Sequence, residues 1–136
     1  MGNRNNIIIK QPSVGVEDTQ PLYLYSHWHG SELRKVVADA IWRAPKQRLN
    51  QPDYFTRILF CEMVKGDIEG VTDFGISVNL VPDQDANNSP ITVGWDTVEP
   101  SGWFDDMYQC YVIYGDEKYE ATDFAYKFST EAKHGV

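Results

Sequence analysis

The chain has 136 residues, of which 42% are hydrophobic, and carries a formal net charge of −8 at pH 7. This length suits one core and is too short for two comfortable ones, so we expect a single domain over residues 1–136. The longest apolar run near the N-terminus has only three residues, which excludes a membrane anchor there. The chain has two cysteines, Cys61 and Cys110, which excludes a disulfide scaffold. We therefore predict a cytoplasmic protein in which both thiols are reduced and buried.

Two strands are predicted in the first 30 residues. The β-branched run Ile7–Ile9 predicts a first strand buried on both faces, and a turn-rich loop over residues 11–20 should bring the chain back as an antiparallel hairpin. Alternation over residues 22–29 predicts the second strand, with two distinct faces. The face toward the core carries Leu22, Leu24, Ser26 and Trp28, and the other face carries Tyr23, Tyr25, His27 and His29.

A first helix is predicted to begin at Ser31. Gly30 lets the backbone turn without a Cβ clash, and the Ser31 hydroxyl is placed to accept from an amide one turn into the helix. The helix should pack through one apolar stripe formed by Leu33, Val36, Val37, Ala40 and Ile41. Trp42 lies off this stripe, which favours an exposed ring at a ligand pocket or at the interface of a homo-oligomer.

The rest of the chain predicts a second helix and three further strands. The second helix should begin at Pro52, end at Gly66 and be more buried than the first, because its apolar residues wrap nearly the whole circumference. Alternating runs predict strands over 73–80, 91–96 and 107–114, the first two paired antiparallel. Phe124 and Phe128 predict a closing helix, with an edge strand as the alternative.

This order of elements predicts an α+β fold. We expect a mainly antiparallel sheet of about five strands with two helices on one face.

The chain start and the turn before the first helix carry a pair of short motifs. Met1-Gly2-Asn3-Arg4 precedes a β-branched run, and Tyr25, His27, Trp28 and Gly30 fit the pattern Tyr-x-His-Trp-x-Gly. Together they resemble a loose set of uncharacterised proteins from phages and bacterial genomes, which usually have Ala where this chain has Asn5. The resemblance covers roughly the first third of the chain. It implies a phage or mobile-element origin, hence the host cytoplasm, and no assigned activity.

A ligand site is predicted around the start of the first helix. The helix amides and the positive end of its dipole should face the His-Trp-His-Gly turn and receive a carboxylate or phosphate. Residues 1–65 carry nine Lys/Arg against six Asp/Glu, and residues 66–136 carry three against fourteen, so an anion is drawn to the first half while bulk nucleic acid is repelled. A solvated helix face is the alternative for the basic residues. The predicted site comprises Tyr23, Tyr25, His27, Trp28, His29, Gly30, Ser31, Arg34 and Lys35.

Catalytic and metal chemistry have weaker signals. His27 and His29 could supply two metal ligands, but the sequence offers no third, so we predict no metal and no cofactor. Glu62 lies on an apolar stripe and could be a general base, or could pair with Arg57 or Lys65. Neither cysteine has the surroundings of a nucleophile, and the sequence has no Gly-rich phosphate loop.

Three functional hypotheses remain. The first is a phage-type, non-enzymatic binding protein that sequesters a small anionic, nucleotide-like signal of host defence. The second is an inhibitor of a host protein, in which acidic residues imitate nucleic-acid charge. Its candidate residues are Asp105, Asp106, Asp116 and Glu117. The third is a hydrolase or phosphodiesterase that uses His27 and His29, with Glu62 as base.

Overall fold

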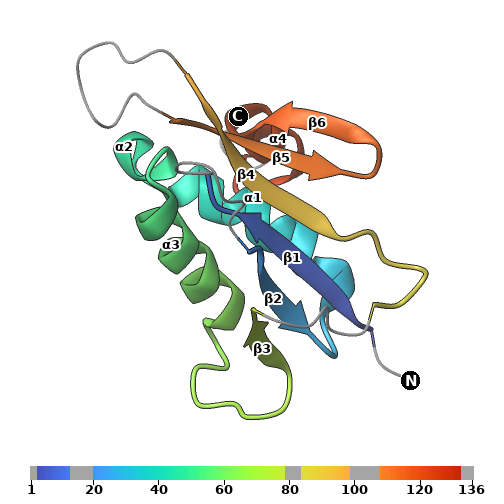
Figure 1. Ribbon diagram of the computed structural model, residues 1–136. Helices are drawn as coiled ribbons and strands as arrows, with labels where there is room; N and C mark the ends of the chain where they lie inside the picture. Colours follow the sequence, from blue (N-terminus) through green and yellow to red (C-terminus); the bar gives the residue numbers. More distant parts are fainter. Residues whose placement is uncertain (1–2, 13–19, 79–83, 99–107, 133–136) are drawn as a thin grey trace.

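A six-stranded sheet with helices against one face forms the architecture (Figure 1). The computed structural model describes residues 3–12, 20–78, 84–98 and 108–132. In chain order the elements are β1 (Asn5–Lys10), β2 (Leu22–Ser26), the 3₁₀ turn η1 (Gly30–Glu32), α1 (Leu33–Arg43), α2 (Lys46–Leu49), α3 (Pro52–Val64), β3 (Phe74–Ser77), β4 (Ile91–Thr97), β5 (Tyr108–Tyr114), β6 (Glu117–Glu120) and α4 (Ala121–Phe128). The strands are ordered β3-β2-β1-β4-β5-β6.

Four of the five strand pairings are antiparallel, so the predicted α+β fold is confirmed. The predicted β1–β2 hairpin forms, with Ile7 opposite Leu24. The predicted pairing of β3 with β4 is wrong, because β4 lies between β1, to which it is parallel, and β5. β3 pairs instead with β2 at the sheet edge, where Ile76 remains 54% exposed. The more continuously buried strand takes a central position, where both of its edges are paired.

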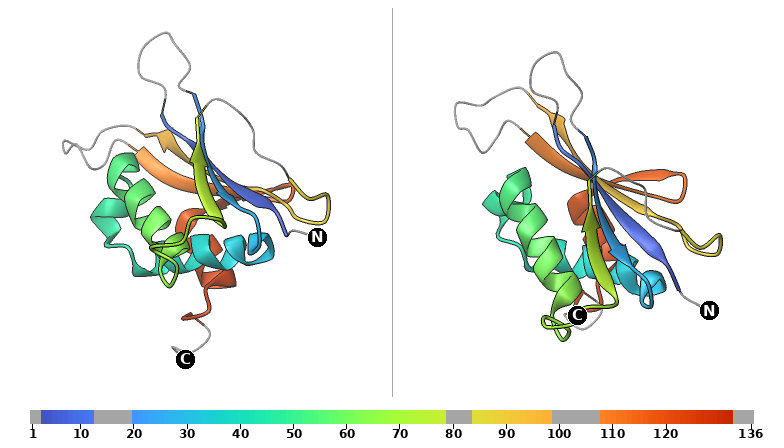
Figure 2. Two further views of the ribbon diagram at one scale, coloured as in Figure 1. Left: turned by 90° about the horizontal axis from the view of Figure 1, so that it is seen from below. Right: turned by 60° about the horizontal axis from the view of Figure 1, so that its bottom comes forward.

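The core lies between the sheet and the helices. The strand registers place one set of side chains toward the helices, and all of them are fully buried: Ile7, Ile9, Leu24, Ile91, Val93 and Val112. Figure 2 shows α1, α3 and α4 on this face of the sheet. The predicted stripe of α1 packs here, with Leu33, Val37 and Ala40 fully buried.

The opposite face of the sheet is not covered by any helix of the described residues (Figure 2). A row of partly buried side chains crosses it on adjacent strands, formed by Tyr23, Ile8, Thr92 and Ile113. Ile8 is therefore only half-buried, while its neighbours Ile7 and Ile9 are completely buried.

The helices differ from the sequence-based expectation in number and burial. A one-turn helix, α2, follows Pro45 and was not predicted, and α4, a helix of two turns, confirms the closing helix. α3 is less buried than α1, because it packs against its neighbours through one side only and leaves Tyr54 and Cys61 exposed. The prediction of two buried thiols is therefore wrong for Cys61. Cys110 is buried, and burial raises the pKa of its thiol far above the ordinary value, which leaves it unreactive.

Helix boundaries follow the predicted signals. Pro52 occupies the first turn of α3. Gly66 follows the end of that helix with a φ of 92°, a backbone conformation that residues with a side chain rarely adopt. Among the described helices, none combines the length and the apolar character needed to cross a bilayer.

Candidate functional site

The turn between β2 and η1 is held by two buried polar side chains. One carboxylate oxygen of Asp73 accepts hydrogen bonds from the Ser26 hydroxyl at 2.9 Å, the His27 amide at 3.0 Å and the Trp28 amide at 2.9 Å. The Ser26 hydroxyl in turn accepts from the His29 amide at 2.9 Å. Ser26 is completely buried and Asp73 is 7% exposed. The turn is therefore fixed from inside the fold by groups that satisfy its free amides.

The second carboxylate oxygen of Asp73 is hydrogen-bonded to Nδ1 of His29. Burial alone would raise the pKa of Asp73, but hydrogen bonds from the Trp28 amide, His29 and the Ser26 hydroxyl outweigh it and bring the pKa below its ordinary value. The His29 ring also stacks on Phe74, with 5.9 Å between the ring centroids. Sequence reasoning missed Asp73, because it follows from the β2–β3 pairing that the alternating pattern did not predict.

The two histidines of the turn do not converge on one site. Nδ1 of His27 lies 3.2 Å from the hydroxyl of Tyr25, whose side chain is on the uncovered face of the sheet. His29 instead pairs with Asp73, which also bonds to Ser26 on the core side. The alternation predicted through His29 ends at Ser26, where β2 ends. The prediction that Trp28 faces the core is also wrong, since it is 50% exposed.

The amides at the start of the first helix are already occupied. Asn3 accepts from the Gly30 amide at 2.6 Å through its carbonyl and from the Ser31 amide at 3.2 Å through its side chain. The Ser31 hydroxyl accepts from the amide nitrogen of the Asn3 side chain at 2.8 Å and makes no helix cap. The predictions of a Ser31 cap and of helix amides open to an anion are therefore wrong, because Asn3, two residues before β1, accepts from the amides of both Gly30 and Ser31.

Gly30 is required by close packing rather than by a left-handed backbone conformation, since its φ is not positive. It is buried, and a Cβ placed on it would collide with the Asn3 carbonyl oxygen and the Asn5 side chain. Close packing therefore explains why the Tyr-x-His-Trp-x-Gly motif has glycine at this position.

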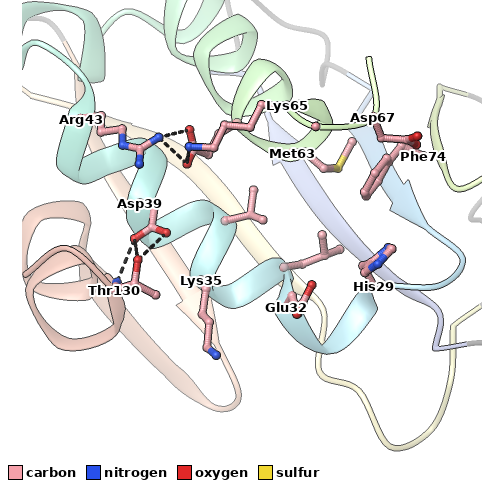
Figure 3. Close-up of a pocket in the computed structure, with 14 residues that line it drawn as sticks. His29, Glu32, Lys35, Asp39, Arg43, Met63, Lys65, Asp67, Phe74 and Thr130 are labelled. Atoms are coloured by element: carbon pink, nitrogen blue, oxygen red, sulfur yellow. Dashed lines mark hydrogen bonds and ion pairs between the residues drawn. The ribbon is translucent and has the colours of Figure 1, made fainter. Parts of the chain in front are cut away.

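Two hollows lie on different sides of α1 and divide the predicted site residues. The larger, which we call the α1–α3 hollow, has a volume of about 540 Å³ and includes His29 and Lys35 (Figure 3). The smaller, which we call the Arg34 crevice, has a volume of about 200 Å³ and includes Gly30, Ser31 and Arg34. Tyr23, Tyr25 and His27 line neither hollow.

The α1–α3 hollow has an apolar floor and charged walls. Leu33, Val36, Met63 and Phe74 contribute apolar surface. Glu62 lies in the wall, where its carboxylate pairs with Arg43 at 3.0 Å and with Lys65 at 2.9 Å. The predicted Lys65 pairing is thus confirmed, and Arg43 takes the place predicted for Arg57. Both contacts hold the Glu62 carboxylate in the wall of the hollow as part of an ion-pair cluster.

The Arg34 crevice is lined by neutral polar groups and one cation. Together with Tyr114 and Arg34 it contains Asn5, Ser31, Asn87, Asn88 and Ser89. Nη1 of Arg34 donates to the Tyr114 hydroxyl at 3.4 Å, and its guanidinium carbon lies 4.9 Å from the centre of the Phe128 ring and 5.6 Å from that of Tyr114. The guanidinium is therefore oriented by aromatic rings.

Known proteins add no assignment to this geometry. No protein-family model, curated protein or solved structure matches this chain. Its resemblance to short phage and bacterial proteins therefore stays a prediction.

Two further sets of residues bear on the remaining hypotheses. Within the described parts of the chain, no group of three or more His, Cys, Asp or Glu could hold a metal ion.

Of the acidic residues in the inhibitor hypothesis, Asp116 and Glu117 are exposed at the β5–β6 turn, and Asp105 and Asp106 lie outside the described residues. The hydrolase hypothesis needs His27 and His29 at one site, and they face different sides of the sheet.

Proposed function

We propose that this chain is a binding protein that holds a small anionic, nucleotide-like ligand without turnover, with the anionic group in the Arg34 crevice. The observation that carries this proposal is the state of Arg34. Within the described residues its guanidinium pairs with no carboxylate, and its Nε is buried without a hydrogen-bond partner.

A buried guanidinium nitrogen without a partner costs free energy unless a ligand satisfies it. Planar guanidinium groups suit carboxylate and phosphate oxygens, to which they can donate two parallel hydrogen bonds. The contacts with Tyr114 and Phe128 orient Arg34 without neutralising its charge. The crevice therefore supplies a preorganised cation for an anion.

The other groups of the crevice support the same conclusion. The Ser31 hydroxyl and the Asn87 side chain can donate to an anion, and none of the described residues that line the crevice is acidic. The α1–α3 hollow differs, because its walls carry Glu32, Asp39, Glu62 and Asp67. An anion is thus favoured on the Arg34 side of α1.

The size of the crevice limits what it can enclose. A volume of about 200 Å³ accepts a phosphate or carboxylate group and leaves the remainder of a nucleotide outside. If the chain comes from a phage, as its motifs imply, a nucleotide signal of host defence is the ligand class that this function would sequester.

Calorimetry with inorganic phosphate, adenosine monophosphate and a cyclic dinucleotide tests the proposal. We expect at least one of these probes to bind and to be recovered chemically unchanged. Arg34→Met keeps an apolar stem against Tyr114 and Phe128 but removes the charge, so affinity should fall roughly 10- to 100-fold, as expected for a lost charge-assisted hydrogen bond.

Lys35→Met is the matched control, since Lys35 is the next residue on α1 but lines the other hollow. It should keep the affinity of the wild type. Absence of binding for every probe, or equal affinity of the Arg34→Met and wild-type proteins, would overturn the proposal.

A further inference from the structure

We propose that the α1–α3 hollow is a second binding site, for a small neutral molecule with an apolar body and a hydroxyl group that donates to Nε2 of His29. The site uses none of the residues of the Arg34 crevice and stands independently of it. It combines a fixed hydrogen-bond acceptor, an apolar floor and walls in which Glu62 is paired with Arg43 and Lys65.

The acceptor follows from the way Asp73 holds the imidazole. An ionised carboxylate can only accept hydrogen bonds, so Nδ1 of His29 must carry the proton in their contact. In the neutral ring, Nε2 then keeps its lone pair. Because Nδ1 and Nε2 are on different edges of the ring, pairing with buried Asp73 turns Nε2 away from the fold. Within the described residues Nε2 has no hydrogen-bond partner, and the His29 side chain is 55% exposed.

The surroundings of His29 favour an apolar body. Phe74 stacks against the imidazole, and Leu33, Val36 and Met63 extend the apolar surface beside it. Figure 3 shows Met63 and Phe74 near His29, while the side chain of Lys35 extends away from them. A ligand bound against this surface would remove apolar area from water, which is the main favourable term for such a pocket.

The charges of the walls favour a neutral ligand. Four carboxylates and three cations line the hollow, and two of the cations, Arg43 and Lys65, are paired with Glu62. Asp39 accepts from the Ser129 hydroxyl and from the amide and hydroxyl of Thr130. Figure 3 shows Arg43 and His29 at different ends of the hollow. The two paired cations therefore leave the hollow with a small excess of carboxylates, which disfavours an anionic ligand, and the apolar floor beside His29 favours a neutral one.

Phenol and its methyl ether, anisole, are the probes that test the site, because they differ in the hydroxyl hydrogen and have similar apolar rings. In titrations followed by NMR we expect phenol to perturb the His29 ring and the residues of the floor. Phenol should bind about two- to tenfold more tightly than anisole, the range that one neutral hydrogen bond provides.

Two variants separate the role of His29 from a general change in the fold. Asp73→Asn places an amide beside Nδ1, so the proton moves to Nε2 and the acceptor becomes a donor. The ¹⁵N spectrum should show this change of tautomer, and the preference for phenol should disappear. His29→Ala should lose the same preference, while the Ser26 hydroxyl and the His27 and Trp28 amides continue to hold the other oxygen of Asp73.

His27→Ala is the matched control, because His27 bonds to Tyr25 on the other face of the sheet. It should keep the wild-type preference for phenol. The proposal is overturned if phenol does not perturb the hollow, if anisole binds as tightly as phenol, or if Asp73→Asn changes the tautomer and leaves the preference intact.

Discussion

Asp73 is the residue on which the geometry of the β2–η1 turn depends. Its two oxygens bond to Ser26, His29 and the backbone amides of His27 and Trp28, so one buried side chain fixes four consecutive residues. These donors stabilise the charged carboxylate and lower its pKa despite burial. The residue therefore links the position of His29 to the ionisation of a single acid.

We predict that Asp73 contributes to the acid sensitivity of the fold. Because its pKa in the folded protein lies below the ordinary value of about 4, its stabilisation is complete above that value and is lost as the pH falls through the lower folded value. Urea unfolding of wild type and Asp73→Asn at several pH values measures this. The variant should be less stable at neutral pH by about 1–3 kcal/mol, and the difference should shrink at acid pH. A difference that stays constant with pH would contradict this prediction.

For single residues, the sequence indicated which side chains line a hollow better than it indicated which groups they contact. His29, Arg34 and Lys35 were predicted as site residues, and each lines a hollow. Asp73 and Asn3 were not predicted, because their partners are 44 and 28 residues away in the chain and depend on strand pairing. Periodicity identifies the face of a side chain but not which distant group it meets.

The fold of the C-terminal third depends on α4, which anchors β5 and β6 to the helix layer. Phe124 is completely buried and makes edge contacts with Tyr114 and Tyr119, at 6.2 and 5.5 Å between ring centroids. Tyr126, on the same helix, is 73% exposed. Replacing the buried Phe124 therefore tests the contribution of packing, and replacing the exposed Tyr126 on the same helix serves as the control.

Phe124→Ala should destabilise the protein by about 3–5 kcal/mol, because it leaves a cavity beneath α4. Tyr126→Ala, as control, should change the unfolding free energy by less than about 0.5 kcal/mol. Chemical denaturation of both variants measures the difference. Equal losses would contradict the prediction, because Ala favours a helix more than Phe or Tyr does and only the lost contacts of Phe124 can account for its larger cost.

Elements were predicted more successfully than their partners. Alternation over 73–80 and 91–96 indicates two strands, and both exist, although the structure assigns β3 only to Phe74–Ser77 and residues 79–80 lie outside the described part. Alternation does not reveal whether a strand is central or at an edge. β4 is buried at Ile91, Val93, Gly94 and Trp95, whereas β3 has no buried residue, which matches their central and edge positions.

For the molecule as a whole, stability should decrease from the centre of the sheet toward the β3 edge. β1 and β4 form the parallel centre, with Ile7 opposite Ile91, and both side chains are completely buried. β3 has four residues, pairs on one side only and carries the exposed Ile76. Local opening should therefore require less free energy at β3 than at β1 or β4.

Hydrogen exchange measures this gradient residue by residue. We expect the hydrogen-bonded amides of β3 to exchange at least about tenfold faster than those of β1 and β4, which corresponds to a difference of about 1.4 kcal/mol in opening free energy. Equal rates in β1 and β3 would show that the sheet opens as one unit.

The parallel contact between β1 and β4 also has a consequence for synthesis on the ribosome. β1 is translated early, but the strand that covers its second edge begins at Ile91, more than 80 residues later. Until then the nascent hairpin presents one unpaired apolar edge, which is the kind of surface that chaperones bind and that promotes association between growing chains. Slow translation between β2 and β4 would prolong that exposure and lower the yield of native protein.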